Sequence, residues 1–390
     1  MDRPAPGADE ATSLRELALL FLRLGTIDFG GPAAHIALMH DEVVRRRKWL
    51  TEGEFLDLLG AVNLIPGPNS TELAIHVGYR RRGVAGLVTA GVSFILPAFV
   101  ITLALAWAYV RFERLPAAGF LLYGIKPAVL VVVVQAIHDL VPRAARDTAL
   151  RLIGVAAAAF ALAGVHELAV IVLAGAAMAL LRRHPSSPGT DRKALGLCAL
   201  LPAAPVAASN LTLPSIFWIF LKTGSVLFGS GYVLLAFLRA DLVERHRWLT
   251  EPQLLDAIAV GQLTPGPVFT TATFVGYLLA GHAGAVLATV GIFLPAFVFV
   301  AAAGPLVARV RASPRAGAFL DGVNVASLAL MIVVTLQLGA AALIDGVTIA
   351  IALVSAFLLF YVKLNATWLL ASTALVGTAT QAFSNSAAMP

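Results

Sequence analysis

The sequence predicts an all-α protein that crosses a membrane several times and consists of two homologous halves. The chain of 390 residues is 59% apolar and only 13% charged, whereas a soluble domain carries roughly 25% charged residues. Residues 83–110, 322–344, 346–362 and 364–390 contain no Asp, Glu, Lys or Arg. An uncharged apolar run of about 18 residues or more is a candidate transmembrane helix. In addition, motifs of the first half recur in the second half.

The ends of the charge-free runs divide the chain into elements. We expect spans near residues 14–38, 84–110, 118–138, 150–164 and 168–181, and again near 196–209, 213–238, 283–308, 317–340, 342–361 and 366–386. The apolar segments 53–79 and 252–280 are broken at Pro-Gly-Pro motifs, so they form hairpins or crossing pairs. Residues 1–13 have no basic-then-apolar signal pattern and are interpreted as a surface tail. The predicted domains are this tail, a first repeat at 14–194 and a second repeat at 195–390.

The repeat is visible in several motifs. The stretch "LGTIDFGG" at 24–31 recurs as "TGSVLFGS" at 223–230, "KWLTE" at 48–52 as "RWLTE" at 247–251, and "LIPGP" at 64–68 as "LTPGP" at 263–267. The offset between the halves is 199 residues up to the Pro-Gly-Pro motifs, where Pro66 matches Pro265. It is 198 residues from Val77 and its match Val275 onward. Internal duplication is typical of secondary transporters.

The basic residues predict how the two halves are oriented. "YRRRG" at 79–83 has three arginines, and its counterpart "YLLAG" at 277–281 has none. At the far end of the following span the excess of basic residues reverses. The first repeat has "RFER" at 111–114, and the matching end of the second repeat has Arg309, Arg311 and Arg315. Because cytoplasmic loops carry the excess of Lys and Arg, the second repeat is predicted to be inverted. The net charge of +6 is explained by such loops, so the expected partner is the lipid membrane and not nucleic acid.

The helix breaks are the best candidates for a binding site. Irregular backbone at membrane depth survives only where protein or a polar cavity satisfies it. A helix that restarts after Pro-Gly-Pro presents unpaired N–H groups and a partial positive charge, which suits a small oxyanion. The alternative is that Pro and Gly only kink tightly packed helices. We prefer that alternative for "LPAF" at 96–99 and 294–297, and a site for the duplicated Pro-Gly-Pro motifs with their polar neighbours.

Two sets of candidate residues follow. The predicted substrate-binding residues lie at the breaks, with one lysine in a span: Gly30, Gly31, His35, Asn63, Pro66, Gly67, Asn69, Ser70, Thr71, Lys126, Gly229, Ser230, Gly266, Thr270 and Thr271. The candidates for proton coupling are Glu72, Asp28 and His76. Ionisable residues inside a membrane are functional hypotheses by default, although a hydrogen-bonded structural histidine is an equal alternative for His35 and His76.

The charged candidates have particular roles in this hypothesis. Lys126, whose counterpart is Asn324, is expected to compensate a bound dianion and to pair with Glu72 when the site is empty. The alternative is that Lys126 extends to a lipid headgroup, as we expect for Lys222. Asp57 and Asp256 occupy matching positions, which favours a structural role for both.

Other function classes lack their signatures. The sequence has no HExxH, GxSxG or P-loop motif, and one cysteine, Cys198, allows neither a disulfide nor a thiolate metal site. No enzyme activity, cofactor or metal is therefore expected. A metal site from His35, His76 and Glu72 would have no recognised spacing, and a non-transporting scaffold would not need duplicated helix breaks. A homodimer is an open hypothesis for the assembly.

The motifs also resemble those of a known family. "FGGPAAHIALMH" at 29–40, "RRKWLTEGEFLDLLGAVNLIPGPNSTELAIHVGY" at 46–79 and "GVSFILPAF" at 91–99 are similar to the chromate ion transporter family, in its long-chain, two-domain form. The resemblance covers nearly the whole chain. It implies a multi-pass transporter of the bacterial inner membrane that exports chromate, with sulfate as a related ligand, driven by the membrane potential or the proton gradient. The alternative is a carrier for sulfate, another small anion or an organic metabolite.

The second repeat departs from the family motif. Ser230 and Gly231 stand where the first repeat has Gly31 and Pro32, and the histidine is missing. We therefore expect the first half to provide most of the ligand contacts.

Overall fold

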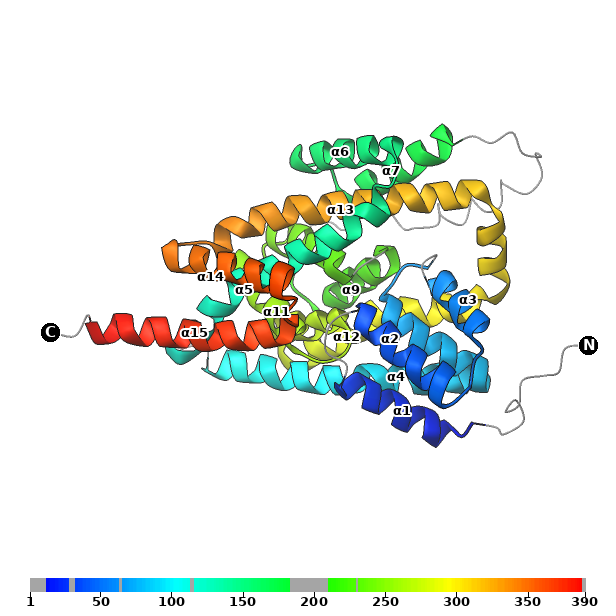
Figure 1. The fold of residues 1–390 in the computed structure, drawn as a ribbon, viewed down its shortest axis with the longest axis horizontal. Helices are drawn as coiled ribbons and strands as arrows, with labels where there is room; N and C mark the ends of the chain where they lie inside the picture. Colours follow the sequence, from blue (N-terminus) through cyan, green and yellow to red (C-terminus); the bar gives the residue numbers. More distant parts are fainter. Residues whose placement is uncertain are drawn as a thin grey trace, which may run out of the picture.

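A computed structural model describes residues 12–27, 32–62, 65–112, 116–182, 210–228 and 231–387, and every regular element in these ranges is a helix (Figure 1). The first half contains α1 (Leu14–Ile27), α2 (Pro32–His40), α3 (Glu52–Val62), α4 (Asn69–Phe112), α5 (Pro116–Ala144), α6 (Thr148–Leu162) and α7 (Glu167–Leu181). The second half contains α9 (Leu213–Val226), α10 (Leu234–Leu238), α11 (Glu251–Leu263), α12 (Thr271–Ala312), α13 (Pro314–Ala342), α14 (Gly346–Phe357) and α15 (Ala366–Ala387).

Four segments are long and apolar enough to cross a membrane: α4, residues Phe120–Ala144 of α5, Val268–Ala302 and α13. The predicted span at 213–238 is divided near its glycine motif, because Leu227, directly after α9, has an extended backbone. α1 ends at Ile27 before α2 begins at Pro32, and α9 ends at Val226. The predicted span at 196–209 and the tail up to residue 11 lie outside the described residues. The fold is therefore that of a multi-pass membrane protein.

The duplication is visible in the backbone. Left-handed φ angles, which are uncommon for residues other than glycine, occur at Lys48 (51°) and again at Arg247 (54°). The Pro-Gly-Pro glycines, Gly67 and Gly266, also have positive φ angles, of 143° and 92°. The same unusual conformations at an offset of 199 residues show that the two halves are built by one local plan.

A reversal divides α4 into two antiparallel helices. Non-helical backbone occurs at Arg82 and Gly83, and a Cβ added at Gly78 would overlap the carbonyl of Gly86. Eight residues of straight helix would separate these two glycines by about 12 Å, so the chain must turn back between them. α12 has the matching break at Ala280.

The predicted hairpin at 53–79 is consistent with contacts between its ends. The guanidinium of Arg80 lies 3.0 Å from the carboxylate of Glu54, and Arg81 donates to the carbonyl of Trp49 at 3.4 Å. The start of α3 therefore lies beside residues 80 and 81 of α4, and the Pro-Gly-Pro turn lies at the other end of this hairpin.

Each Pro-Gly-Pro turn is packed against the opposite half. The N–H of Gly67 donates to the carbonyl of Leu227 at 2.8 Å, and a Cβ at Gly67 would lie 3.6 Å from that of Ala296. In the reciprocal contact, a Cβ at Gly266 would lie 3.0 Å from that of Ala98. Because Ala98 and Ala296 are matching positions, the two turns are held by equivalent "LPAF" segments.

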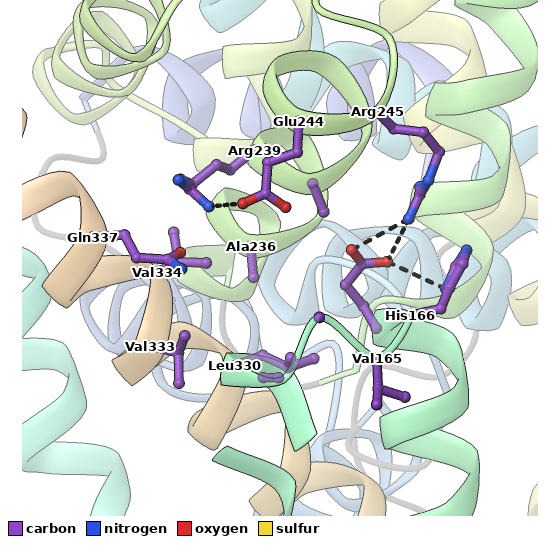
Figure 2. Close-up of a pocket in the computed structure, with 14 residues that line it drawn as sticks. Val165, His166, Ala236, Arg239, Glu244, Arg245, Leu330, Val333, Val334 and Gln337 are labelled. Atoms are coloured by element: carbon purple, nitrogen blue, oxygen red, sulfur yellow. Dashed lines mark hydrogen bonds and ion pairs between the residues drawn. The ribbon is translucent and has the colours of Figure 1, made fainter. Parts of the chain in front are cut away.

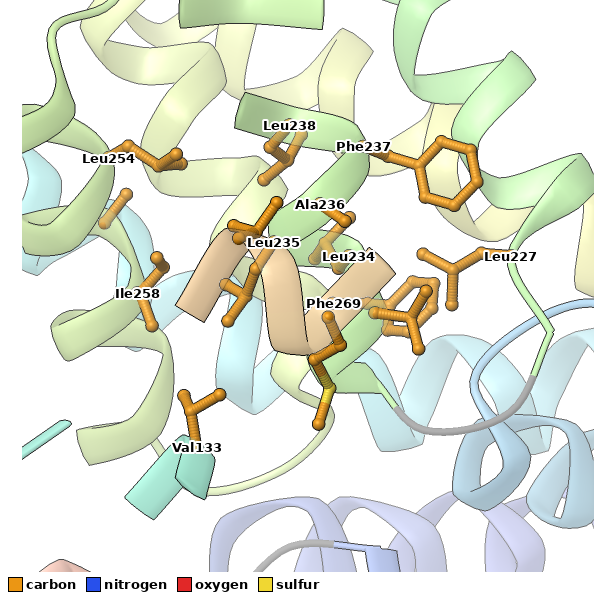
Figure 3. Close-up of a cluster of buried hydrophobic side chains, with 14 of the residues drawn as sticks. Val133, Leu227, Leu234, Leu235, Ala236, Phe237, Leu238, Leu254, Ile258 and Phe269 are labelled. Atoms are coloured by element: carbon orange, nitrogen blue, oxygen red, sulfur yellow. The ribbon is translucent and has the colours of Figure 1, made fainter. Parts of the chain in front are cut away.

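Buried apolar side chains hold these helices in place. In the second half Leu234, Phe237, Leu254 and Phe269 are within one tightly packed cluster (Figure 3). A smaller cluster in the first half joins α1, α3 and α4. The long α13 runs across the molecule with α6 and α7 along one side (Figure 1). The breaks thus sit on a scaffold that is fixed by core packing.

Matched ion pairs complete the repeat. Glu42 lies 3.6 Å from Arg23 and 3.1 Å from Arg46, and at an offset of 199 residues Asp241 pairs with Lys222 and Arg245. The expectation that Lys222 only reaches a lipid headgroup is therefore wrong, because its ammonium is paired with a buried aspartate. The recurrence in both halves indicates a structural role for these acids.

Candidate functional site

Glu72 lies beside the first Pro-Gly-Pro turn in an enclosed position. α4 begins at Asn69, and the carbonyl of the preceding Pro68 accepts the first helical hydrogen bond, from the N–H of Glu72 at 3.0 Å. The Glu72 side chain folds back onto Gly67, where an added Cβ would overlap the carboxylate. The residue is 0% exposed, and neither carboxylate oxygen has a hydrogen-bond partner among the described residues. An ionised carboxylate in such a place would be very unfavourable, so this arrangement suits a neutral, protonated Glu72.

Other polar groups of the same turn are also buried. Thr71 is 0% exposed, and its hydroxyl has no partner in the described part of the chain. Ser70 and His76 are buried one position before and five positions after it, and the Nε2 atom of His76 is likewise unpaired among described groups. His35 packs its ring edge-on against Phe94, with centroids 5.9 Å apart.

The second turn is less open to a ligand. The hydroxyl of Thr270 donates to the carbonyl of Pro267 at 2.8 Å, and that of Thr271 donates to Val268 at 2.8 Å. Thr270 matches Thr71 at the offset of 199, so one hydroxyl is committed to its own turn and the other is not. The turn itself is buried, as Thr264 and Gly266 show.

Several predicted residues cannot be placed. Asp28, Gly30, Gly31, Asn63, Gly229 and Ser230 lie outside the described residues. The structure therefore brings together the predicted residues from Pro66 to His76. It gives no position for the glycines of the motifs at 24–31 and 223–230 that fall outside the described residues.

Lys126 has a partner other than the one expected. Its ammonium lies 3.0 Å from Oδ1 of Asp256 on α11, and the hydroxyl of Tyr109 on α4 donates to Oδ2 of Asp256 at 3.0 Å. The predicted pairing of Lys126 with Glu72 is wrong for this conformation. A lysine in a span needs a counter-charge, and the packing of α5 on α11 supplies one from the opposite half.

Asp57 and Asp256 do not share an environment, although their positions match. Asp256 on α11 is buried, with 4% of the residue exposed, whereas Asp57 on α3 is exposed to solvent. The matching positions therefore do not give the two aspartates the same surroundings, and the structural role expected for both stays a prediction. Sequence reasoning also missed Tyr109, and the signal was weak because a tyrosine near the end of a span is common at membrane interfaces.

A separate cavity of about 400 Å³ lies between α13, the loop before α7 and the end of α10 (Figure 2). Its polar lining includes Arg239, Arg245, Glu167 and Glu244. Arg239 pairs with Glu244, and Arg245 lies 3.3 Å from Glu167. Two cations facing two carboxylates leave no net positive charge for a dianion.

His166 adds no positive charge to this cavity near neutral pH. Burial of the imidazole lowers the pKa of His166 below its ordinary value, although the neighbouring Glu167 carboxylate opposes that shift. Nδ1 of His166 lies 3.2 Å from the carboxylate of Glu167. Within the described ranges no group of three His, Cys, Asp or Glu side chains is placed to hold a metal ion.

Comparisons with known proteins identify relatives over almost the full length. A family model described as "Chromate transporter" matches residues 15–180 and 214–378. A protein named chromate transport protein from Cupriavidus metallidurans is 35% identical, over 94% of this chain and 92% of the relative. One of the same name from Pseudomonas aeruginosa is 32% identical over 96% of both chains. A probable chromate transport protein from Synechococcus elongatus is 32% identical over 88% of this chain and 89% of the relative. No solved structure matches the chain.

Proposed function

We propose that this chain, which belongs to the chromate transporter family, exports chromate from the bacterial cytoplasm across the inner membrane and thereby gives chromate resistance. The family is one of transporters and not of enzymes. Transport is driven by the membrane potential or the proton gradient. The names of three relatives, each matched over most of its length, support chromate as the substrate.

The observation that carries this proposal is the polar turn at the start of α4. A new helix begins at Asn69, deep among packed helices, and the uncommitted hydroxyl of Thr71 and the side chain of Glu72 lie in its first turn. Helix N-termini bind anions through free N–H groups and a partial positive charge. We place the oxyanion at this turn, with the hydroxyls of Ser70 and Thr71 and the N–H groups at the start of α4 as donors.

Glu72 is the proton carrier in this proposal. It is fully buried without a partner among the described residues, so it holds a proton in this conformation and releases it when the turn becomes hydrated. A carboxyl that changes its protonation between two conformations can couple transport to the proton gradient. Lys126 supplies the full positive charge that two helix ends, of about half a charge each, do not provide for a dianion.

The Thr71 and Thr270 pair offers a matched test of the site. Thr71→Val is expected to weaken chromate binding about 10-fold or more, because a hydrogen bond to a charged ligand contributes about 1.5–3 kcal/mol. Thr270→Val removes a hydroxyl that is bonded to Pro267, so it should lower stability by about 1 kcal/mol and leave binding unchanged. Equilibrium dialysis and thermal unfolding of both variants would measure this. Equal binding by Thr71→Val and the parent chain would remove Thr71 from the site.

We also propose that the two halves are inverted repeats. The support is the reversed arginine excess and the reciprocal packing of each Pro-Gly-Pro turn on the opposite half. In this arrangement Arg80, Arg81 and Arg82 face the cytoplasm, and Leu278 to Ala280 face the periplasm.

Cysteine labelling tests the orientation. Arg82 and His282 are exposed near the matching reversals, whereas Arg81 is bonded to Thr12. In a Cys198→Ser background, Arg82→Cys should react with an impermeant maleimide only in inverted vesicles. His282→Cys should react only in right-side-out vesicles. Labelling of both from one side would contradict the inverted arrangement and leave the transport proposal standing.

Competition in inverted vesicles tests the substrate class. Uptake of labelled chromate should be inhibited by sulfate, which is also a tetrahedral dianion, and not by amino acids or carboxylates. An imposed membrane potential or proton gradient should accelerate the uptake. Inhibition by organic anions alone would favour the alternative, a carrier for an organic metabolite.

A further inference from the structure

The cluster of Lys126, Tyr109 and Asp256 is not repeated by the residues at the matching positions of the two repeats. The positions that match Lys126 and Tyr109 in the second repeat are Asn324 and Val307, and the match of Asp256 is the exposed Asp57. The matching helices of the second repeat therefore form without a lysine or a tyrosine at these positions. A functional role therefore explains this charged cluster in an apolar interface better than a role in folding.

The cluster also joins the two halves. Lys126 and Tyr109 belong to α5 and α4 of the first repeat, and Asp256 belongs to α11 of the second. Both oxygens of Asp256 are engaged, at 3.0 Å each. Titratable groups that face Asp256 from the packed helices include Lys126 of α5 and Tyr109 of α4. The carboxylate thus neutralises Lys126 when no anion is present.

The exposures of the two partners differ. The side chain of Lys126 is 20% exposed, and that of Asp256 is 5% exposed. An anion can therefore approach the ammonium while the carboxylate stays covered. A dianion placed there with an ionised Asp256 would gather three negative charges around one positive charge in a poorly solvated place, which is strongly unfavourable. A proton on Asp256 removes one of those negative charges and leaves Lys126 to the anion.

We propose that Asp256 exchanges Lys126 for a proton when the tetrahedral dianion binds, so that the anion and one proton bind together. This inference rests on the proposed function, because it requires a dianion at Lys126. It assigns to Asp256 and Tyr109 a task that is distinct from that of Glu72, which is already neutral in this conformation. Asp256 positions and releases the lysine, and Tyr109 holds the aspartate in its charged form.

The proposal fixes the sign of the pH dependence. If a proton binds with the anion, affinity must fall as the pH rises, by up to about tenfold per pH unit. Asparagine cannot bind the proton and cannot neutralise Lys126. Asp256→Asn should therefore bind the anion with an affinity that does not change with pH and that exceeds the parent affinity at high pH. Tyr109→Phe removes a donor from the carboxylate, so the fall should begin about one pH unit higher.

The experiment is equilibrium binding of radioactive sulfate to the purified full-length protein over a series of pH values. Sulfate is the probe because it stays a dianion, whereas chromate takes up a proton near neutrality. Asp57→Asn is the matched control, since it removes the equivalent exposed carboxylate and should leave the pH dependence as in the parent chain. Lys126→Gln should lose binding at every pH.

The outcomes separate this inference from the proposed function. A pH-dependent parent, with a flat and tight Asp256→Asn variant, supports the exchange. The same pH dependence in Asp256→Asn would overturn it and leave oxyanion binding intact. Normal binding by Lys126→Gln would also overturn it, because Lys126 would then serve only the interface. If the parent binds neither sulfate nor chromate, the proposed function fails and this inference fails with it.

Discussion

Replacing Lys126 by Gln is expected to reduce chromate transport by about 100-fold or more. The ammonium is the full positive charge that offsets a dianion at membrane depth, and loss of one partner of a buried charge pair costs about 3–5 kcal/mol. Transport of labelled chromate into inverted vesicles, normalised to the amount of folded protein, measures the effect.

The same substitution also leaves Asp256 without its lysine, so a second variant is needed. The double variant Lys126→Gln with Asp256→Asn removes both charges and should recover the stability of the parent chain, because a buried pair can be replaced by neutral groups at little cost. We expect it to fold well and still to lack transport. Near-normal rates in the double variant would show that the ion pair serves the packing of α5 on α11 and not the anion.

Glu72→Gln is expected to keep oxyanion binding and to lose the dependence of transport on the proton gradient. Glutamine has the shape of the protonated carboxyl that this enclosed place favours, so the helix start and the contact with Gly67 are preserved. It cannot release a proton when the turn opens. Liposomes with and without an imposed pH gradient, at zero membrane potential, should show a clear acceleration for the parent chain and none for Glu72→Gln.

Glu54→Gln is the control for this second prediction. Glu54 forms an exposed ion pair with Arg80, which contributes less than about 1 kcal/mol, so its loss should leave the acceleration unchanged. A Glu72→Gln variant that still responds to the gradient would assign proton coupling to another group, and Asp256 would be the next to test.

The helices and their breaks were predictable where neighbouring residues along the chain determine the backbone. Charge-free runs located the long spans, and the Pro-Gly-Pro motifs located the breaks, because proline and glycine determine the backbone at their own positions. The match between the "LIPGP" and "LTPGP" turns also predicted that the breaks are duplicated. Their reciprocal packing on the opposite half depends on contacts between residues about 160–230 positions apart, and no local pattern encodes such contacts.

The ion pairs were not predictable for the same reason. Matching positions indicated a structural role for Asp57 and Asp256, but their burial differs, because Lys126 of α5 and Tyr109 of α4 cover Asp256 while Asp57 is exposed on α3. Lys126 was identified as a charge that needs a partner, and the predicted partner was Glu72, whereas the structure pairs it with Asp256. Which acid it meets depends on how the helices cross, and that is a property of the assembled core.

Counterflow of labelled chromate by the purified chain in liposomes tests the central claim most directly, since it requires no gradient and no other protein. Liposomes loaded with unlabelled chromate or sulfate should accumulate external labelled chromate transiently, and liposomes loaded with chloride should not. The Lys126→Gln and Asp256→Asn double variant should show no accumulation. Equal entry of label whatever the internal anion, or accumulation by the double variant equal to that of the parent, would contradict an oxyanion carrier that uses Lys126.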